Sequence, residues 1–230
     1  MRGTDPVWFV DLDNTLHDAS KRIFSALDST ITAFIADELG LSHTDANELR
    51  IEYWRRYGAT LSGLVRHHGV KVQHYVDRTH AFIDEGVVTD WVTVGSGLDR
   101  ALSMLPGRKI LLTNAPRRYA SRVLLALGLE RAFTKCIPIE EMHLHGTLRP
   151  KPSRALLRAV AARERVSAEN AILVEDSVAN LKAARAIGWR TVFVSGFLAP
   201  RAKVRINRPA YVDLQVKSIA QLALRYRGLF

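Results

Sequence analysis

Short apolar runs recur along this chain, and each has the length of a buried strand. They cover residues 7–10, 109–112, 135–139, 171–174 and 191–194, with a weaker sixth run near Tyr211. Between residues 95 and 195 these runs alternate with helical patterns, which predicts βαβ units and a parallel sheet. The expected fold class is therefore α/β, with a Rossmann-like parallel sheet.

A second pattern, with apolar residues every three or four positions, predicts the helices. After the first strand it covers residues 23–40, 44–57, 60–68 and 72–83 in succession, and Gly40 and Gly58 are expected helix stops. Later helices are expected at 95–105, 116–127, 152–165, 178–187 and 216–226, and a loop or hairpin at 140–149. We therefore expect an α/β core formed by residues 1–17 and 91–230, and an inserted all-helical domain formed by residues 18–90.

Polar side chains gather where three of the predicted strands end, with a lysine before a later helix. They are Asp11 and Asp13, then Thr113 and Asn114, then Lys151 between two prolines, then Glu175 and Asp176. The carboxyl ends of the strands form the usual ligand site of an open α/β sheet. Clustered carboxylates cost solvation free energy, which a chain accepts where a divalent cation or a reacting phosphate needs oxygen ligands.

Each of these elements also has a simpler structural interpretation. Residues 11–15 suit a polar turn, Lys151 suits an exposed loop, and residues 175–176 suit an acid pair at a helix N-terminus. The occurrence of all four elements in one order favours a functional site over this set of separate explanations.

The ordered set DxDxT, TN, KP and ED resembles the haloacid dehalogenase superfamily of phosphatases. The resemblance implies that Asp11 is the nucleophile, which forms an aspartyl-phosphate and binds Mg²⁺. It implies that Asp13 protonates the leaving group, deprotonates the attacking water and offers its backbone carbonyl to the metal. A second aspartate at this position argues against the dehalogenase branch, which attacks carbon and does not need it.

The same resemblance implies roles for the later residues. Asp176 is the further metal ligand, and Glu175 orients Lys151 or lies in the second metal shell. Thr113 and the Asn114 amide hold phosphate oxygens, and Lys151 offsets the charge shared by the phosphate and the nucleophile. Residues 18–90 correspond to the helical cap that lies above the active site in this superfamily.

Three longer segments are similar to the pyrimidine 5′-nucleotidase subfamily: DLDNTLHDAS at 11–20, LRIEYWRRYGATLSGLVRHHGV at 49–70 and LLTNAPRRYASRVLLALGL at 111–129. This similarity implies a substrate like UMP or CMP. Tyr53, Arg56 and Tyr57 are candidate contacts for the leaving group, although a helical cap core would use such aromatic residues too. The alternative substrate is another small phosphorylated metabolite, such as a sugar phosphate or phosphoglycolate.

The net charge of +10, from 33 basic and 23 acidic residues, favours anionic ligands. The basic residues are spread along the chain and form no aromatic-interleaved stripe, so the sequence does not favour nucleic-acid binding. A basic binding protein that kept this fold and lost turnover is the alternative from another class.

The single cysteine, Cys136, has no internal disulfide partner and suits a reducing compartment. The sequence contains no apolar run long enough for a spanning helix and no signal-peptide pattern. These features predict a cytoplasmic protein that does not insert into a membrane.

Overall fold

The computed structural model describes residues 5–82, 90–92, 97–197 and 209–229. A six-stranded sheet has the order β3-β2-β1-β6-β7-β8, and every pairing in it is parallel. Its strands are β1 Val7–Val10, β2 Arg108–Leu112, β3 Lys135–Ile137, β6 Ala171–Glu175, β7 Arg190–Val194 and β8 Leu214–Val216. The predicted α/β class with a parallel Rossmann-like sheet is confirmed.

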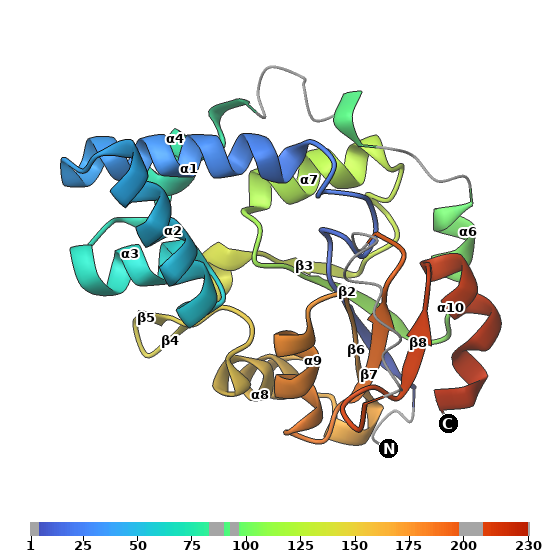
Figure 1. The fold of residues 1–230 in the computed structure, drawn as a ribbon. Coiled ribbons are helices and arrows are strands. Elements are labelled where there is room, and N and C mark those ends of the chain that lie inside the picture. The colour runs from blue at the N-terminus through green and yellow to red at the C-terminus, as the bar shows by residue number, and fades with distance from the viewer. Residues whose placement is uncertain (1–4, 83–89, 93–96, 198–208, 230) are drawn as a thin grey trace.

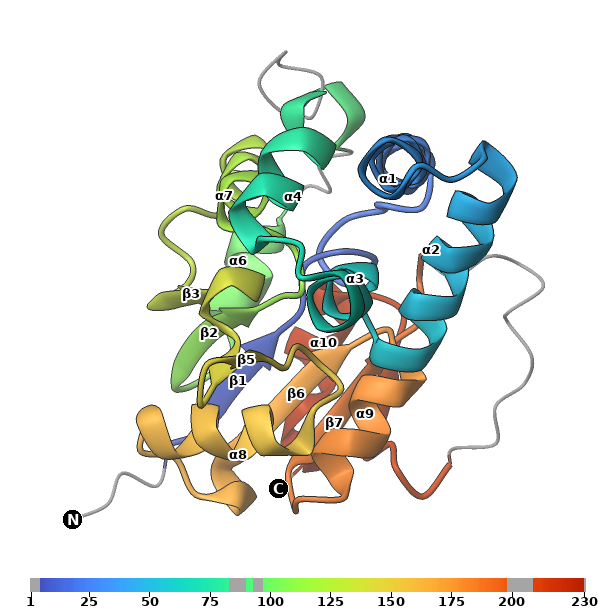
Figure 2. The ribbon, with the colours of Figure 1, turned by 90° about the vertical axis from the view of Figure 1, so that its left-hand side faces the viewer.

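Helices cover both faces of this sheet (Figures 1 and 2). Trp8 and Val10 of β1 join an apolar cluster with α6, α7 and α10, whereas Val7 and Phe9 join a second cluster with α8 and α9. These helices span α6 Leu98–Ser103, α7 Arg117–Ala126, α8 Arg154–Arg163, α9 Val178–Arg185 and α10 Ile219–Arg225. Because both faces are covered, β1 is apolar at every position and does not alternate with polar residues.

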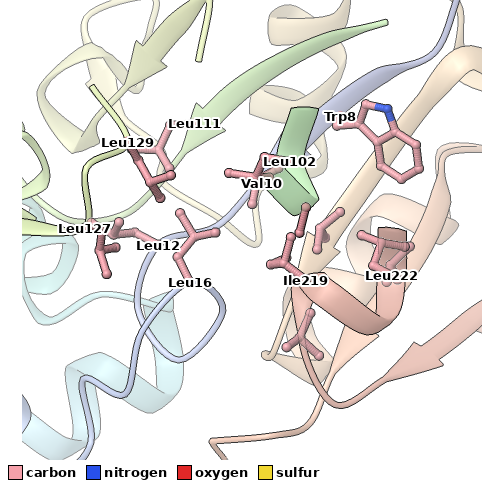
Figure 3. Close-up of a cluster of buried hydrophobic side chains, with 14 of the residues drawn as sticks. Trp8, Val10, Leu12, Leu16, Leu102, Leu111, Leu127, Leu129, Ile219 and Leu222 are labelled. Carbon is pink, nitrogen blue, oxygen red and sulfur yellow. The ribbon is translucent and has the colours of Figure 1, made fainter. Parts of the chain in front are cut away.

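The loop after β1 is held in place by the first of these clusters. Leu12 and Leu16 are buried there, and Figure 3 shows them near Leu127 and Leu129. Leu12 lies between Asp11 and Asp13 in the sequence, so its burial anchors the segment that carries both carboxylates. Burying a leucine side chain stabilises the fold by about 1.5–3 kcal/mol, which helps to hold the two acidic residues at the end of the strand.

The described residues between positions 18 and 90 include four α-helices, which form a helical block. They are α1 Ile23–Leu39, α2 His43–Tyr57, α3 Thr60–His68 and α4 Val72–Thr79, grouped on the left of Figure 1. Helix α2 packs against both α1 and α3, and α4 packs against α1. Across the described ranges, the helices lack the combination of length and apolarity needed to cross a bilayer.

Several boundaries differ from the sequence predictions. Helix α2 is capped by Ser42, whose hydroxyl accepts a hydrogen bond from the Asp45 N–H, so its start precedes the predicted Thr44. The last strand lies at Leu214–Val216 and not at Tyr211. Residues 140–149 include a hairpin of β4 His143–Leu144 and β5 Thr147–Leu148, as predicted. The predicted helix end at Ile83 and the predicted helix start at residue 95 lie outside the described residues.

Candidate active site

Lys151 lies between two carboxylates at the carboxyl end of the sheet. Its Nζ donates hydrogen bonds to Asp11 Oδ1 and to Glu175 Oε2, both at 2.7 Å. Asp11 directly follows β1, and Glu175 is the last residue of the adjacent strand β6, so the parallel register places their side chains together. All three residues are buried. The structure therefore brings together groups separated by up to 164 positions of sequence, 11 to 175.

Glu175 is saturated with hydrogen-bond donors. Its Oε1 accepts from the backbone N–H groups of Asp176 and Ser177, both at 3.1 Å. Its Oε2 accepts from Lys151 and, at 2.9 Å, from the Asn180 side-chain amide. A carboxylate with this many donors is held in one orientation, so Glu175 is placed to orient the Lys151 ammonium.

Burial and mutual repulsion shift the titration of these groups. Burial, followed by the charge of Glu175, raises the pKa of Asp11 above its ordinary value, and the same two causes raise the pKa of Asp176. Burial would also raise the pKa of Glu175, but Lys151 and the hydrogen bonds to the carboxylate lower it. Burial would lower the pKa of Lys151, but Asp11 and Glu175 outweigh it and keep the ammonium charged.

The charge and the donor atoms of this cluster fit a divalent cation. Oxygen atoms of Asp11, Glu175 and Asp176 all lie within 4.8 Å of one another. When ionised, these three carboxylates face a single ammonium, so the cluster has two more negative than positive charges. Hard oxygen ligands with this excess charge suit Mg²⁺ better than zinc, which favours Cys and His.

Asp13 lies beside this cluster, and two side chains bind its carboxylate. Its Oδ1 accepts a hydrogen bond from the Tyr119 hydroxyl at 2.6 Å and another from His17 Nε2 at 3.0 Å. Both partners are buried, while the Asp13 side chain keeps 18% of its surface exposed. Asp13 is thus held in place and remains accessible to a bound molecule.

The two residues that follow β2, Thr113 and Asn114, both form hydrogen bonds with nearby backbone groups. The Asn114 side chain forms two hydrogen bonds with the Lys151 backbone: Nδ2 donates to the carbonyl at 2.9 Å, and Oδ1 accepts from the N–H at 3.0 Å. This pair of bonds fixes the backbone of Lys151 and leaves the second Nδ2 proton of Asn114 able to donate, so binding of phosphate by the amide stays a prediction. Thr113 is buried, and its hydroxyl oxygen accepts from the Ala115 N–H at 3.0 Å, which leaves its own proton to donate.

The helical block contacts the lysine loop at Gly58, the residue that ends α2. Gly58 has a φ of +79°, and a Cβ atom there would lie 2.5 Å from Pro152 Cδ and 2.6 Å from the Lys151 carbonyl oxygen. A left-handed conformation and this close approach both require glycine. The end of α2 therefore rests directly on the backbone of the buried lysine.

We expect Gly58→Ala to lower the free energy of unfolding by about 1–3 kcal/mol more than Gly69→Ala does. Gly69 is the matched control because it ends α3 with a similar φ of +68°, and a Cβ atom added there would have no heavy atom within 4 Å. Displacement of Lys151 should also reduce turnover about ten- to a hundredfold in Gly58→Ala alone. Urea unfolding measures the loss of stability, and steady-state kinetics measure the loss of turnover. Equal losses in the two variants would show that the contact of Gly58 with the Lys151 loop does not matter.

The three candidate substrate contacts lie on α2 or at its end. Tyr53 is buried between α2 and α3, and its hydroxyl bonds to His68 Nε2 at 2.8 Å. It therefore serves the helical core, which was the alternative interpretation. The Arg56 side chain is 65% exposed and lies over the Tyr57 ring at 5.5 Å. Tyr57 directly precedes Gly58 in the sequence, and its hydroxyl bonds to His67 Nε2 at 2.6 Å.

Four residues at or beside the site were absent from the sequence prediction: His17, His80, Tyr119 and Asn180. His80 is buried at the end of α4, with its ring centroid 6.3 Å from that of Tyr119. Asn180 lies in the first turn of α9, five positions after Glu175, where a helix that follows a strand commonly returns a side chain to the site. His80 and Tyr119 had no spacing that marked them, because tertiary packing brings them to the site. His17 lies four positions after Asp13 in the same loop, so its contact with Asp13 is local.

A parallel α/β sheet with buried carboxylates and a lysine at its carboxyl ends defines a class of open-sheet proteins with a polar site at the strand ends. A comparison with protein families matches residues 7–188 to the haloacid dehalogenase-like hydrolases. The chain therefore belongs to the haloacid dehalogenase-like hydrolase family.

A curated relative is Phosphate metabolism protein 8 of Saccharomyces cerevisiae, which is 26% identical over 197 residues. The match covers 79% of this chain, and the chain spans 59% of the length of that relative.

Solved structures with the same fold include proteins with different named activities. A haloacid dehalogenase-like protein of unknown function from Agrobacterium tumefaciens has a TM-score of 0.62, with 19% identity and coverage of 98% and 99% of the two chains. A phosphatase from Thermococcus onnurineus has a TM-score of 0.61, with 18% identity and the same coverage. The L-2-haloacid dehalogenase from Xanthobacter autotrophicus has a TM-score of 0.60, with 16% identity and coverage of 99% and 100%. At these identities, the likeness shows the fold alone.

Proposed function

We propose that this protein is a Mg²⁺-dependent phosphomonoester hydrolase that acts through an aspartyl-phosphate intermediate. Pyrimidine nucleoside 5′-monophosphates are the substrate class that we propose first. The observation that carries the proposal is the position of Asp11 and Asp13, two carboxylates with separate partners at the end of the central strand.

Asp11 has the surroundings that a nucleophile at phosphorus needs. Lys151 offsets its charge, so an anionic substrate is not repelled, and Asn114 fixes the backbone of that lysine. Attack by a carboxylate oxygen divides a difficult hydrolysis into two easier steps. The Thr113 hydroxyl, buried at the end of β2, is a candidate donor to a phosphate oxygen.

Asp13 supports phosphoryl chemistry over dehalogenation. An ester oxygen that leaves phosphorus needs a proton, whereas a halide that leaves carbon does not. Asp13 follows the nucleophile by two positions and is partly exposed, so a protonated Asp13 is suited to this donation. After the leaving group departs, the same carboxylate would take a proton from the water that attacks the intermediate.

The proposed metal ligands are Asp11, Asp176 and the backbone carbonyl of Asp13. Bound Mg²⁺ would neutralise the phosphate and the excess charge of the carboxylate cluster. We propose that Glu175 does not bind the metal directly but orients Lys151, because Lys151, Asn180 and two backbone N–H groups already donate to its oxygens.

We further propose that residues 18–90 act as a cap over a core formed by residues 1–17 and 91–230. Two contacts support the role of a cap, because they place the helical block against site residues. Gly58 contacts Lys151, and His80 packs against Tyr119. The segments shared with the pyrimidine 5′-nucleotidase subfamily lie in both parts. The name of the yeast relative refers to phosphate metabolism and agrees with a phosphorylated small-molecule substrate.

The first test is phosphate release with Mg²⁺ and with EDTA across UMP, CMP, purine monophosphates, sugar phosphates and p-nitrophenyl phosphate. We expect release that favours UMP or CMP and that falls about a hundredfold or more when EDTA removes the metal, because the carboxylate cluster then repels the substrate. Readdition of Mg²⁺ is the control and should restore the rate.

Each other outcome of this panel has a definite meaning. Metal-dependent release from sugar phosphates or p-nitrophenyl phosphate alone would keep the mechanism and reject the nucleotide substrate. If the panel shows no phosphatase activity, release of halide from 2-chloropropionate in a separate assay would reject phosphoryl chemistry. A folded protein with no turnover and with salt-dependent nucleic-acid binding would indicate the binding protein that the net charge of +10 suggests.

A further inference from the structure

The two hydrogen bonds to the Asp13 carboxylate end on the same oxygen. The Tyr119 hydroxyl and His17 Nε2 both bind Oδ1, at 2.6 Å and 3.0 Å. Among the described residues, the other oxygen, Oδ2, accepts no hydrogen bond. The carboxylate is therefore held asymmetrically, with one oxygen bound to the protein and one left open.

We propose that Tyr119 and His17 are positioning residues that make Oδ2 of Asp13 the atom that carries the catalytic proton. This inference rests on the proposed phosphatase function and assigns the acid step to one atom. A carboxylate oxygen has two lone pairs in the carboxyl plane, and two donors fill them at Oδ1. A proton bound by Asp13 is then directed to Oδ2, because at Oδ1 it would displace one of these donors.

The surroundings of the two donors make this arrangement rigid. Tyr119 is 1% exposed and lies in the first turn of α7, and His17 is fully buried in the loop after β1. Hydrogen bonds to a charged acceptor are strong where water is excluded. Nδ1 of His17 is buried without a partner in the described part of the chain. The bond from Nε2 to Asp13 is therefore the polar contact that the structure gives this ring. His80 packs against the Tyr119 ring from the helical block.

The proton balance of the two steps follows. In the first step, an Asp11 oxygen bonds to phosphorus, the ester P–O bond breaks, and the leaving oxygen takes the proton from Asp13 Oδ2. In the second step, water attacks phosphorus and gives a proton to the same Oδ2, while the bond between phosphorus and the Asp11 oxygen breaks. Asp13 ends protonated, Asp11 ends as a carboxylate, and inorganic phosphate is released.

The test compares an alkyl ester with an aryl ester in Tyr119→Phe. The alkoxide leaving from UMP needs a proton, whereas p-nitrophenolate is stable without one. We expect Tyr119→Phe to lower kcat/KM for UMP about ten- to a hundredfold and for p-nitrophenyl phosphate less than about threefold. The quantity kcat/KM is suitable because it reports the steps up to loss of the leaving group. A sugar phosphate replaces UMP if the substrate panel prefers it.

Tyr75→Phe is the matched control, because Tyr75 is a buried tyrosine whose ring also lies close to that of His80, at 6.4 Å, and no hydrogen bond joins it to Asp13 in the described structure. It should change neither ester's rate. His17→Gln, which keeps a donor near the position of Nε2, should retain more UMP activity than His17→Leu. If Tyr119→Phe does not fold, the comparison of His17→Gln with His17→Leu tests the positioning role instead.

Equal losses for both esters in Tyr119→Phe, or equal activity in the two His17 variants, would overturn the assignment while the phosphatase function stands. A wild-type protein that hydrolyses neither ester with Mg²⁺ would overturn the phosphatase function itself, and the assignment with it.

Discussion

Asp11→Asn is expected to lower phosphate release by about 10³-fold or more, because a carboxamide oxygen is a poor nucleophile and forms no aspartyl-phosphate. The substitution keeps the size and shape of the side chain, so substrate access should not change. Phosphate release under saturating substrate and Mg²⁺ measures the effect. Activity near that of the wild type would show that Asp11 is not the nucleophile.

The same variant is expected to fold and to be at least as stable as the wild type without metal. Asn removes one negative charge from a buried cluster with excess negative charge, and Lys151 keeps its bond to Glu175. Asp77→Asn is the matched control, since Asp77 is exposed on α4 and bonds only locally to Gln73 within the described structure. Thermal unfolding of the three proteins separates loss of chemistry from loss of fold.

Lys151→Met should destabilise the protein and abolish turnover together. Methionine fills most of the space but leaves Asp11 and Glu175 as buried carboxylates without their shared cation. Removal of one member of a buried ion pair typically costs about 3–5 kcal/mol. Urea unfolding without metal measures the loss, and we expect added Mg²⁺ to restore part of the stability but not the activity.

Lys135→Met is the matched control for this experiment. Lys135 Nζ bonds to Glu164 Oε1 at the same distance of 2.7 Å, but its side chain is 39% exposed. The Glu164 side chain is only 9% exposed, but Arg108 and Arg163 lie within 3.6 Å of it and remain as partners, so this variant should stay closer to the wild type in stability and activity than Lys151→Met. A loss for Lys151→Met no larger than that for Lys135→Met would show that burial of the lysine does not matter.

The sequence by itself determined the class of fold, because the decisive signals are local. A strand that is covered on both faces must be apolar at every position, and residues 7–10 and 171–174 carry that signature. The sequence signals for helix ends are also local, since Gly40 and Gly58 adopt the left-handed conformation that few other residues accept. The convergence of Asp11 and Glu175 was predictable too, because parallel strands place their carboxyl ends at one edge.

Only the tertiary structure decided which partner each polar group has. Asn114 was expected at the site from its place after a strand, but only the fold shows that its amide also holds the backbone of Lys151. Tyr53 looked like a substrate contact but packs between two helices. Tyr119 carries no sequence signal that links it to Asp13, because it is 106 positions away from it. Hydrogen bonds depend on distances below about 3.5 Å, and such distances are fixed by the packing of side chains from separate elements, not by spacing along the chain.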